Sequence, residues 1–189
     1  MRILIIDNND SFTYNLLQLV RENSSASTKV IQYGDVRSKD WDLADKVIIS
    51  PGPGVPEDFA EYSHWLNLFG QTKAVLGICM GHEILAQYYG CKISRLDSVS
   101  HGQRKNIRIL TREHYIFRDM EESFDIGLYH SWIVERDNLN KELEINCEDE
   151  VKSIMGMHHN SLDLIGFQFH PESYMTKEGY KLMQNWIAY

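Results

Sequence analysis

Apolar residues in the first half of the chain gather in short runs, and these runs alternate with segments of helical periodicity. Each run is long enough for a strand buried on both faces. The predicted strands lie at residues 3–6, 29–33, 46–50 and 74–78. The predicted helices lie around residues 16–20, 61–69 and 81–89. This alternation predicts an α/β fold with a mostly parallel, twisted sheet and helices on both of its faces.

The second half of the chain has a different pattern, in which short strand-like segments are separated by polar connections. These segments lie at residues 91–96, 104–110, 125–129, 132–134, 143–147 and 152–157. They indicate either an antiparallel extension of the sheet or a separate small hairpin layer. Residues 164–169 predict a last buried strand. Residues 176–187 predict a closing helix with apolar positions Tyr180, Leu182, Met183, Trp186 and Ile187. With no repeat or linker, a single domain over residues 1–189 is expected.

Charge and cysteine content narrow the function classes. The formal net charge is −8, and no Lys/Arg cluster alternates with aromatic residues, which argues against nucleic acid as a partner. No apolar stretch approaches membrane-spanning length. Three cysteines without CxxC spacing suit a reducing cytoplasm better than a disulfide framework. Several histidines match no metal-ligand spacing and are expected to face solvent, without a metal: His101, His114, His130, His158 and His159.

Cys79 has the flanks of a catalytic nucleophile. It lies between Gly77 and Gly81, directly after the apolar run that ends at Ile78. The two glycines remove side chains that would clash in a sharp strand-to-helix turn. Such a turn places the sulfur at a helix N-terminus, where the dipole favours thiolate over thiol. Cys91 and Cys147 lack such flanks and are interpreted as structural.

His170 and Glu172 are candidates for the base and for the group that orients it. His170 follows the last predicted strand, so it is expected beyond the carboxyl end of the sheet, as Cys79 is. A carboxylate two residues later can fix the imidazole tautomer. The alternative is a surface histidine beside a helix-capping glutamate. Residues 51–54 read Pro-Gly-Pro-Gly, which is an ordinary tight turn after a strand; in an acyl-transfer site a glycine N–H of this turn and the N–H of Met80 could be oxyanion donors.

Five motifs together resemble class I glutamine amidotransferases. They are residues 7–16 (DNNDSFTYNL), 50–54 (SPGPG), 77–83 (GICMGHE), 129–132 (YHSW) and 166–173 (GFQFHPES). Within this family the chain is similar to the small subunits, or component II, of anthranilate synthase and aminodeoxychorismate (para-aminobenzoate) synthase. The resemblance covers essentially the whole chain.

The resemblance implies that Cys79 attacks glutamine, that His170 is the base, and that Glu172 orients it. It implies that the N–H groups of Gly52 and Met80 form the oxyanion hole, and that Gly52, Gly54, Glu83, Ser131 and Trp132 hold the substrate. Ammonia would pass to a larger chorismate-binding subunit, and docking is expected at Asp10, Ser11, Tyr14, His101 and Gly102. No cofactor is expected in this chain, with Mg²⁺ only in the large partner.

The chain departs from the family pattern at three places. Glu83 stands where relatives carry glutamine, four residues after the nucleophile and on the same helix face. A carboxylate there could pair with the substrate ammonium or repel its carboxylate, and it would tend to raise the thiol pKa. We expect Glu83→Gln to lower the KM for glutamine. Residues 103–106 and Leu128 also differ from common family residues, in regions where partner contact is expected.

Three alternatives compete with this interpretation. The chain could serve another biosynthetic synthase of the same family, or it could be a catalytically weakened regulatory partner. Asp7 and Asp10 are also similar to the acidic pocket of a phospho-acceptor receiver domain. That fold needs an aspartate at the end of the third strand, where Ser50 and Pro51 stand.

Overall fold

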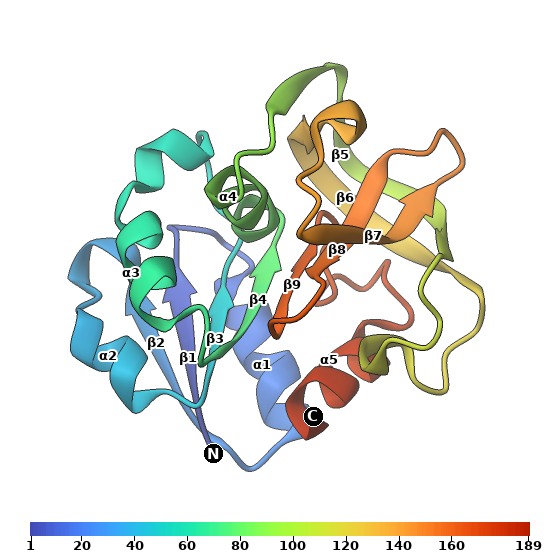
Figure 1. The fold of residues 1–189 in the computed structure, drawn as a ribbon. Helices are drawn as coiled ribbons and strands as arrows, with labels where there is room; N and C mark the ends of the chain where they lie inside the picture. Colours follow the sequence, from blue (N-terminus) through green and yellow to red (C-terminus); the bar gives the residue numbers. More distant parts are fainter.

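A computed structural model describes all 189 residues of the chain (Figure 1). The strands are β1 Arg2–Asp7, β2 Ser27–Gln32, β3 Lys46–Ile49, β4 Ala74–Ile78, β5 Ile93–Ile109, β6 Ser123–Val134, β7 Leu143–Asp149, β8 Ile154–His159 and β9 Leu164–Phe167. The helices are α1 Thr13–Asn23, α2 Ser38–Leu43, α3 Glu61–Phe69, α4 Met80–Tyr88 and α5 Gly179–Ala188. Short 3-10 turns are η1 Tyr33–Asp35, η2 Pro56–Phe59, η3 Tyr115–Phe117 and η4 Arg136–Asn138.

All nine strands form one mixed sheet in the order β2-β1-β3-β4-β9-β8-β7-β5-β6. The first five in this order pair in parallel, and the remaining pairs are antiparallel. The α/β prediction is confirmed, and the second half is an extension of the sheet. The sheet also places β9, the last strand in the sequence, beside β4, so the segments after these two parallel strands share one edge.

Both faces of β1, β3, β4 and β9 are buried, which explains why these strands are apolar at nearly every position, whereas the edge strand β2 is partly exposed. Successive side chains of a strand point to opposite faces. Ile3 and Ile5 of β1 therefore join a core with residues of α1 and α5. Leu4 and Ile6 join a second core with residues of α2, α3 and α4. Figure 1 shows α2 and α3 on one side of strands β1 to β4, with α1 and α5 on the other.

The prediction of six short strands between residues 91 and 157 is wrong in number, because four strands occupy this region. Residues 91–96 and 104–110 belong to the single strand β5, and residues 125–129 and 132–134 belong to β6. In the polar segment between them, Ser100, His101 and Gln103 of β5 pair with β6, whereas residues 96–99 and Gly102 lie at two register shifts and have no partner there. Gly102 has a φ of 65°. A polar stretch can continue a strand here because part of β5 is exposed and pairing does not depend on side-chain polarity.

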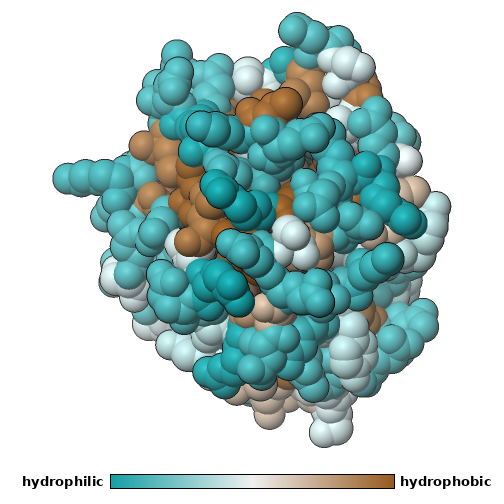
Figure 2. All heavy atoms as spheres, turned by 90° about the vertical axis from the view of Figure 1, so that its right-hand side faces the viewer, coloured by the Kyte–Doolittle hydropathy of each residue, from teal (hydrophilic) through white to brown (hydrophobic).

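Smaller differences concern helices. The structure adds α2, whose six residues are too few to show a periodic pattern. The closing helix begins at Gly179 rather than Thr176. Its residues Leu182, Met183, Trp186 and Ile187 are buried, but Tyr180 is 48% exposed. No helix combines the length and apolar character that crossing a bilayer requires. The face that carries the β5–β6 end of the sheet is mostly hydrophilic, with a few hydrophobic patches (Figure 2).

Candidate active site

Cys79 lies at a sharp turn between β4 and α4. Its backbone has φ 50° and ψ −102°, a conformation that is rare and strained for a residue with a side chain. The turn needs glycine on both sides. A Cβ on Gly77 would collide with the backbone of Gly81, and a Cβ on Gly81 would collide with the carbonyl oxygen of Ile49 in the neighbouring strand. The predicted reason for both glycines, close approach of backbone, is therefore confirmed.

His170 follows β9 and is held from both sides. Its Nδ1 lies 2.6 Å from a carboxylate oxygen of Glu172, as the two-residue spacing predicts. Its backbone N–H donates to the carbonyl of Gly127 in β6 at 3.1 Å. Thr176 fixes the other side, since its hydroxyl donates to the carbonyl of His170 at 2.6 Å. Nε2 of His170 is buried, and no group other than the thiol of Cys79 competes for it.

Two aromatic rings flank the imidazole. The rings of Phe12 and Tyr129 lie with their centroids 5.6 and 5.0 Å from that of His170. Phe12 comes from the loop before α1, and Tyr129 comes from β6. They restrict the ring of His170 and exclude water from it. Sequence reasoning did not assign them a role, although both lie inside motifs that it singled out.

The electrostatics of the thiol correct one expectation. The helix N-terminus was expected to favour thiolate, but burial of the sulfur raises the pKa of Cys79. The hydrogen bond and charge of His170 oppose this effect, whereas the charges of Glu83 and Asp10 add to it. The pKa of His170 is raised well above its usual value: burial lowers it, but the charge of Glu172 and hydrogen bonds with the thiol and with Glu172 outweigh that effect. His170 is therefore a strengthened base beside a thiol that needs one.

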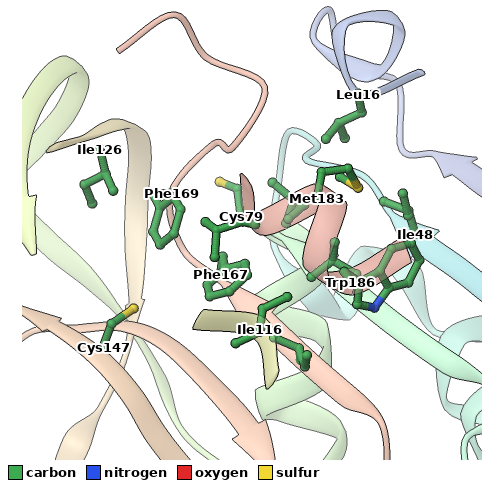
Figure 3. Close-up of a cluster of buried hydrophobic side chains, with 14 of the residues drawn as sticks. Leu16, Ile48, Cys79, Ile116, Ile126, Cys147, Phe167, Phe169, Met183 and Trp186 are labelled. Carbon is green, nitrogen blue, oxygen red and sulfur yellow. The ribbon is translucent and has the colours of Figure 1, made fainter. Parts of the chain in front are cut away.

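Cys79 also belongs to the main hydrophobic core. Figure 3 shows its side chain among Phe167, Phe169 and Met183. These residues come from β9, the segment after it, and α5. The apolar surroundings account for the 8% exposure of Cys79 and for the desolvation that raises its pKa.

A cavity of about 710 Å³ opens over the thiol. Most of the predicted site residues line it: Asp10, Ser11, Gly52, Gly54, Cys79, Met80, Glu83, His101, Ser131 and Trp132. Two predicted docking residues do not. Tyr14 is 66% exposed on α1, and Gly102 is exposed at a register shift of β5. The cavity thus joins the loops after β1, β3 and β4 with the β5–β6 hairpin.

Gln168 is the residue that sequence reasoning missed. Its side chain is fully buried, and its Nε2 donates to Oε1 of Glu83 at 2.9 Å. The same nitrogen lies 3.9 Å from Sγ of Cys79. Its position two residues before His170 was the only signal in the sequence. Arg95 and Asp58 also line the cavity without having been predicted.

The expectation that five histidines face solvent is wrong for three of them. His130, His158 and His159 are 4, 7 and 7% exposed. His130 lies on β6 with Nδ1 2.7 Å from the carbonyl of Trp132. His158 and His159 end β8, an interior strand of the sheet. No group of three His, Cys, Asp or Glu side chains has the geometry to hold a metal ion.

A cysteine at a helix start, an imidazole with its orienting carboxylate, and backbone amides beside them are the parts of a covalent acyl-transfer site. The fold and the site geometry are those suited to cysteine-dependent acyl transfer on a mixed α/β sheet.

Comparison with known proteins specifies the family. The family described as "Glutamine amidotransferase class-I" matches residues 4–188, and the chain belongs to it. Anthranilate synthase component 2 of Leptospira biflexa is 36% identical over 204 residues, covering 99% of each chain. Aminodeoxychorismate synthase component 2 of Escherichia coli is 35% identical over 187 residues, covering 98% of each. The crystal structure of a glutamine amidotransferase from Thermotoga maritima has a TM-score of 0.77 at 17% identity, covering 100% of this chain and 81% of that one.

Proposed function

We propose that this chain hydrolyses glutamine through a thioester on Cys79 and delivers the ammonia to a chorismate-using large subunit that makes anthranilate or 4-amino-4-deoxychorismate. The observation that carries this proposal is a buried thiol on a strained turn, served by an imidazole that Glu172 holds at 2.6 Å. Relatives that match over their full length are named as component 2 of the two synthases, which supports the choice of partner.

The chemistry follows from the positions of the groups. Sγ of Cys79 attacks the side-chain amide carbon of glutamine while His170 accepts the thiol proton. The tetrahedral intermediate collapses, the C–N bond breaks, and His170 gives its proton to the leaving nitrogen, which departs as ammonia. Water then attacks the thioester and loses a proton to His170. The C–S bond breaks, and glutamate leaves as the thiol is restored.

The oxyanion and the rest of the substrate would be held by groups that line the cavity. The N–H groups of Gly52 and Met80 are the proposed oxyanion donors, since Met80 begins α4 and the N–H groups of the first turn lack intrahelical partners. Gly54, Ser131 and Trp132 would bind the amino-acid end of glutamine. All of these residues line the same cavity as Cys79.

The large subunit would dock over the mouth of the cavity, at Asp10, Ser11, Tyr14, His101 and Gly102. Released ammonia would otherwise be lost to protonation and to bulk water, so hydrolysis should depend on docking. The proposed reaction needs no cofactor bound to this chain. Three free cysteines suit the proposed cytoplasmic location.

The test uses the complex of this chain with each candidate large subunit and reads which product forms from chorismate. Cys79→Ala should abolish glutamine-dependent synthesis and leave ammonia-dependent synthesis intact. Loss of both activities would show that Cys79 is structural. If glutamine is hydrolysed but no product forms from chorismate with either candidate subunit, another synthase would be favoured as the partner. A catalytically weakened regulatory chain would instead show no glutamyl thioester by mass spectrometry.

A further inference from the structure

Glu83 is a buried acid without a cationic partner. Its side chain is on the helix face that lines the active-site cavity, yet the residue is only 2% exposed. It takes part in no ion pair, and its one side-chain hydrogen bond is accepted from Gln168. A buried carboxylate without a cation is costly, so such a group holds its proton. Burial raises the pKa of Glu83 to about 7.

Gln168 connects this acid to the nucleophile. One nitrogen of its amide lies 2.9 Å from Oε1 of Glu83 and 3.9 Å from Sγ of Cys79. Oε1 of Gln168 is buried and has no hydrogen-bond partner. Gln168 is thus the group that contacts both the acid and the thiol, and the charge of Glu83 acts to raise the pKa of Cys79.

Other charged or titratable groups face the same cavity from neighbouring elements: Asp10 before α1, Asp58 in η2, Arg95 and His101 in β5, and Tyr129 and His130 in β6. None forms an ion pair with Glu83. Among them only Asp10 acts on the thiol of Cys79, in the same direction as Glu83. His170 acts on Cys79 in the opposite direction. Apart from His170, which contacts the thiol and not Glu83, no cation is placed to cancel the charge that ionisation of Glu83 would introduce.

We propose that Glu83 and Gln168 form a proton-dependent switch on the nucleophile: the glutaminase works with Glu83 neutral, and ionisation of Glu83 suppresses the reactivity of Cys79. The effect on enzyme activity rests on the proposed glutaminase function, whereas the effect on the chemical reactivity of the Cys79 thiol does not. A charge on Glu83 disfavours both the thiolate and the oxyanion of the intermediate. The contacts of Gln168 Nε2 with both atoms keep Oε1 of Glu83 and Sγ of Cys79 no more than about 7 Å apart, and at an effective dielectric of about 20 two like charges at that distance shift each other's pKa by about one to two units.

The first test measures thiol reactivity without any substrate. The alkylation rate of Cys79 by iodoacetamide is followed by peptide mass spectrometry from pH 5.5 to 10, with Cys91 and Cys147 as internal references. We expect Glu83→Gln to lower the midpoint of this profile by about one to two pH units and to increase alkylation at pH 8 about tenfold or more. Glu121→Gln, which removes the same charge from an exposed position, should leave the profile unchanged. Equal midpoints in wild type and Glu83→Gln would overturn the switch.

The second test compares glutaminase kcat/KM with a large subunit present. The ratio of Glu83→Gln to wild type should be near one at pH 6 and reach about ten or more at pH 8.5. A ratio that falls with pH would show that the ionised carboxylate is the working form, for example by pairing with the substrate ammonium, and would overturn the proposal. If Glu83→Gln does not fold, Glu83→Met offers an uncharged side chain of similar length. If wild type and both variants hydrolyse no glutamine at any pH, the glutaminase function is contradicted. The alkylation rates of Cys79 in wild type and variant would still decide the role of Glu83.

Discussion

Replacing Glu83 by glutamine should stabilise the fold, and the gain should depend on pH. The side chain keeps its shape and can still accept the hydrogen bond from Gln168. What disappears is an acid whose pKa rises from 4.5 to about 7 on folding. The stability linked to this group is fully present below pH 4.5, where both states are protonated. It is lost as pH rises towards 7, because the unfolded chain ionises more readily than the folded one.

The magnitude follows from the pKa difference. Each unit is worth about 1.4 kcal/mol, so the wild type loses about 3 kcal/mol between pH 4.5 and pH 7 through Glu83 alone. The stability difference between Glu83→Gln and wild type should therefore grow through this window and become constant above pH 7. With a urea m value of about 2 kcal/mol/M, the unfolding midpoint at pH 8 should rise by about 1.5 M.

Urea unfolding followed by tryptophan fluorescence at pH 5, 6, 7 and 8 would measure this, with Glu121→Gln as the matched control for loss of one carboxylate. The control should stay within about 0.5 kcal/mol of wild type at each pH. A difference between Glu83→Gln and wild type that does not change from pH 5 to pH 8 would refute the reasoning. It would mean that Glu83 is solvated or paired in solution.

Other outcomes follow from the same structure. Glu172→Gln should lower kcat about a hundredfold or more with a smaller change in KM, because the imidazole loses the charge that strengthens it; a KM effect alone would contradict this. Glu83→Gln should lower the KM for glutamine at pH 7.5, and an unchanged or higher KM would reject the idea that the carboxylate impairs binding. Gly81→Ala should cost about 2 to 4 kcal/mol of unfolding free energy, because its Cβ would meet a backbone carbonyl, whereas Gly34→Ala, with open space around it, should cost little. Burial lowers the pKa of His82 to about 3, so the stability linked to this residue should fall by about 2 kcal/mol from pH 6.5 to 5, opposite in sign to the change linked to Glu83; His82→Gln should therefore gain stability relative to wild type as pH falls through this window.

Much of the fold is readable because its signals are local. The strands β1, β3 and β4 are short apolar runs, and the turn at Cys79 is marked by glycines two residues before and after it. Such patterns depend only on side-chain periodicity and on steric limits within a few residues. The predicted contact of His170 with Glu172 is of the same kind, because two residues span it.

The long β5–β6 hairpin and the buried histidines show where local signals end. Residues 97–103 are mostly polar and look like a connection, but Ser100, His101 and Gln103 find backbone partners in β6 across two register shifts. His158 and His159 look like surface residues, but β8 lies inside the sheet and both are buried. Pairing and burial depend on which strands become neighbours, and that is a property of the whole sheet.

The sequence by itself determined that a cysteine sits on a strained turn at the end of a buried strand, with a histidine and a glutamate after another strand. Only the tertiary structure decided that β4 and β9 are neighbours, which brings His170 to Cys79. It also decided that Glu83 is buried, hydrogen-bonded to Gln168 and without an ion-pair partner. The physical reason is range: steric and periodic constraints act between near residues, whereas desolvation of an acid is set by every element that packs around it.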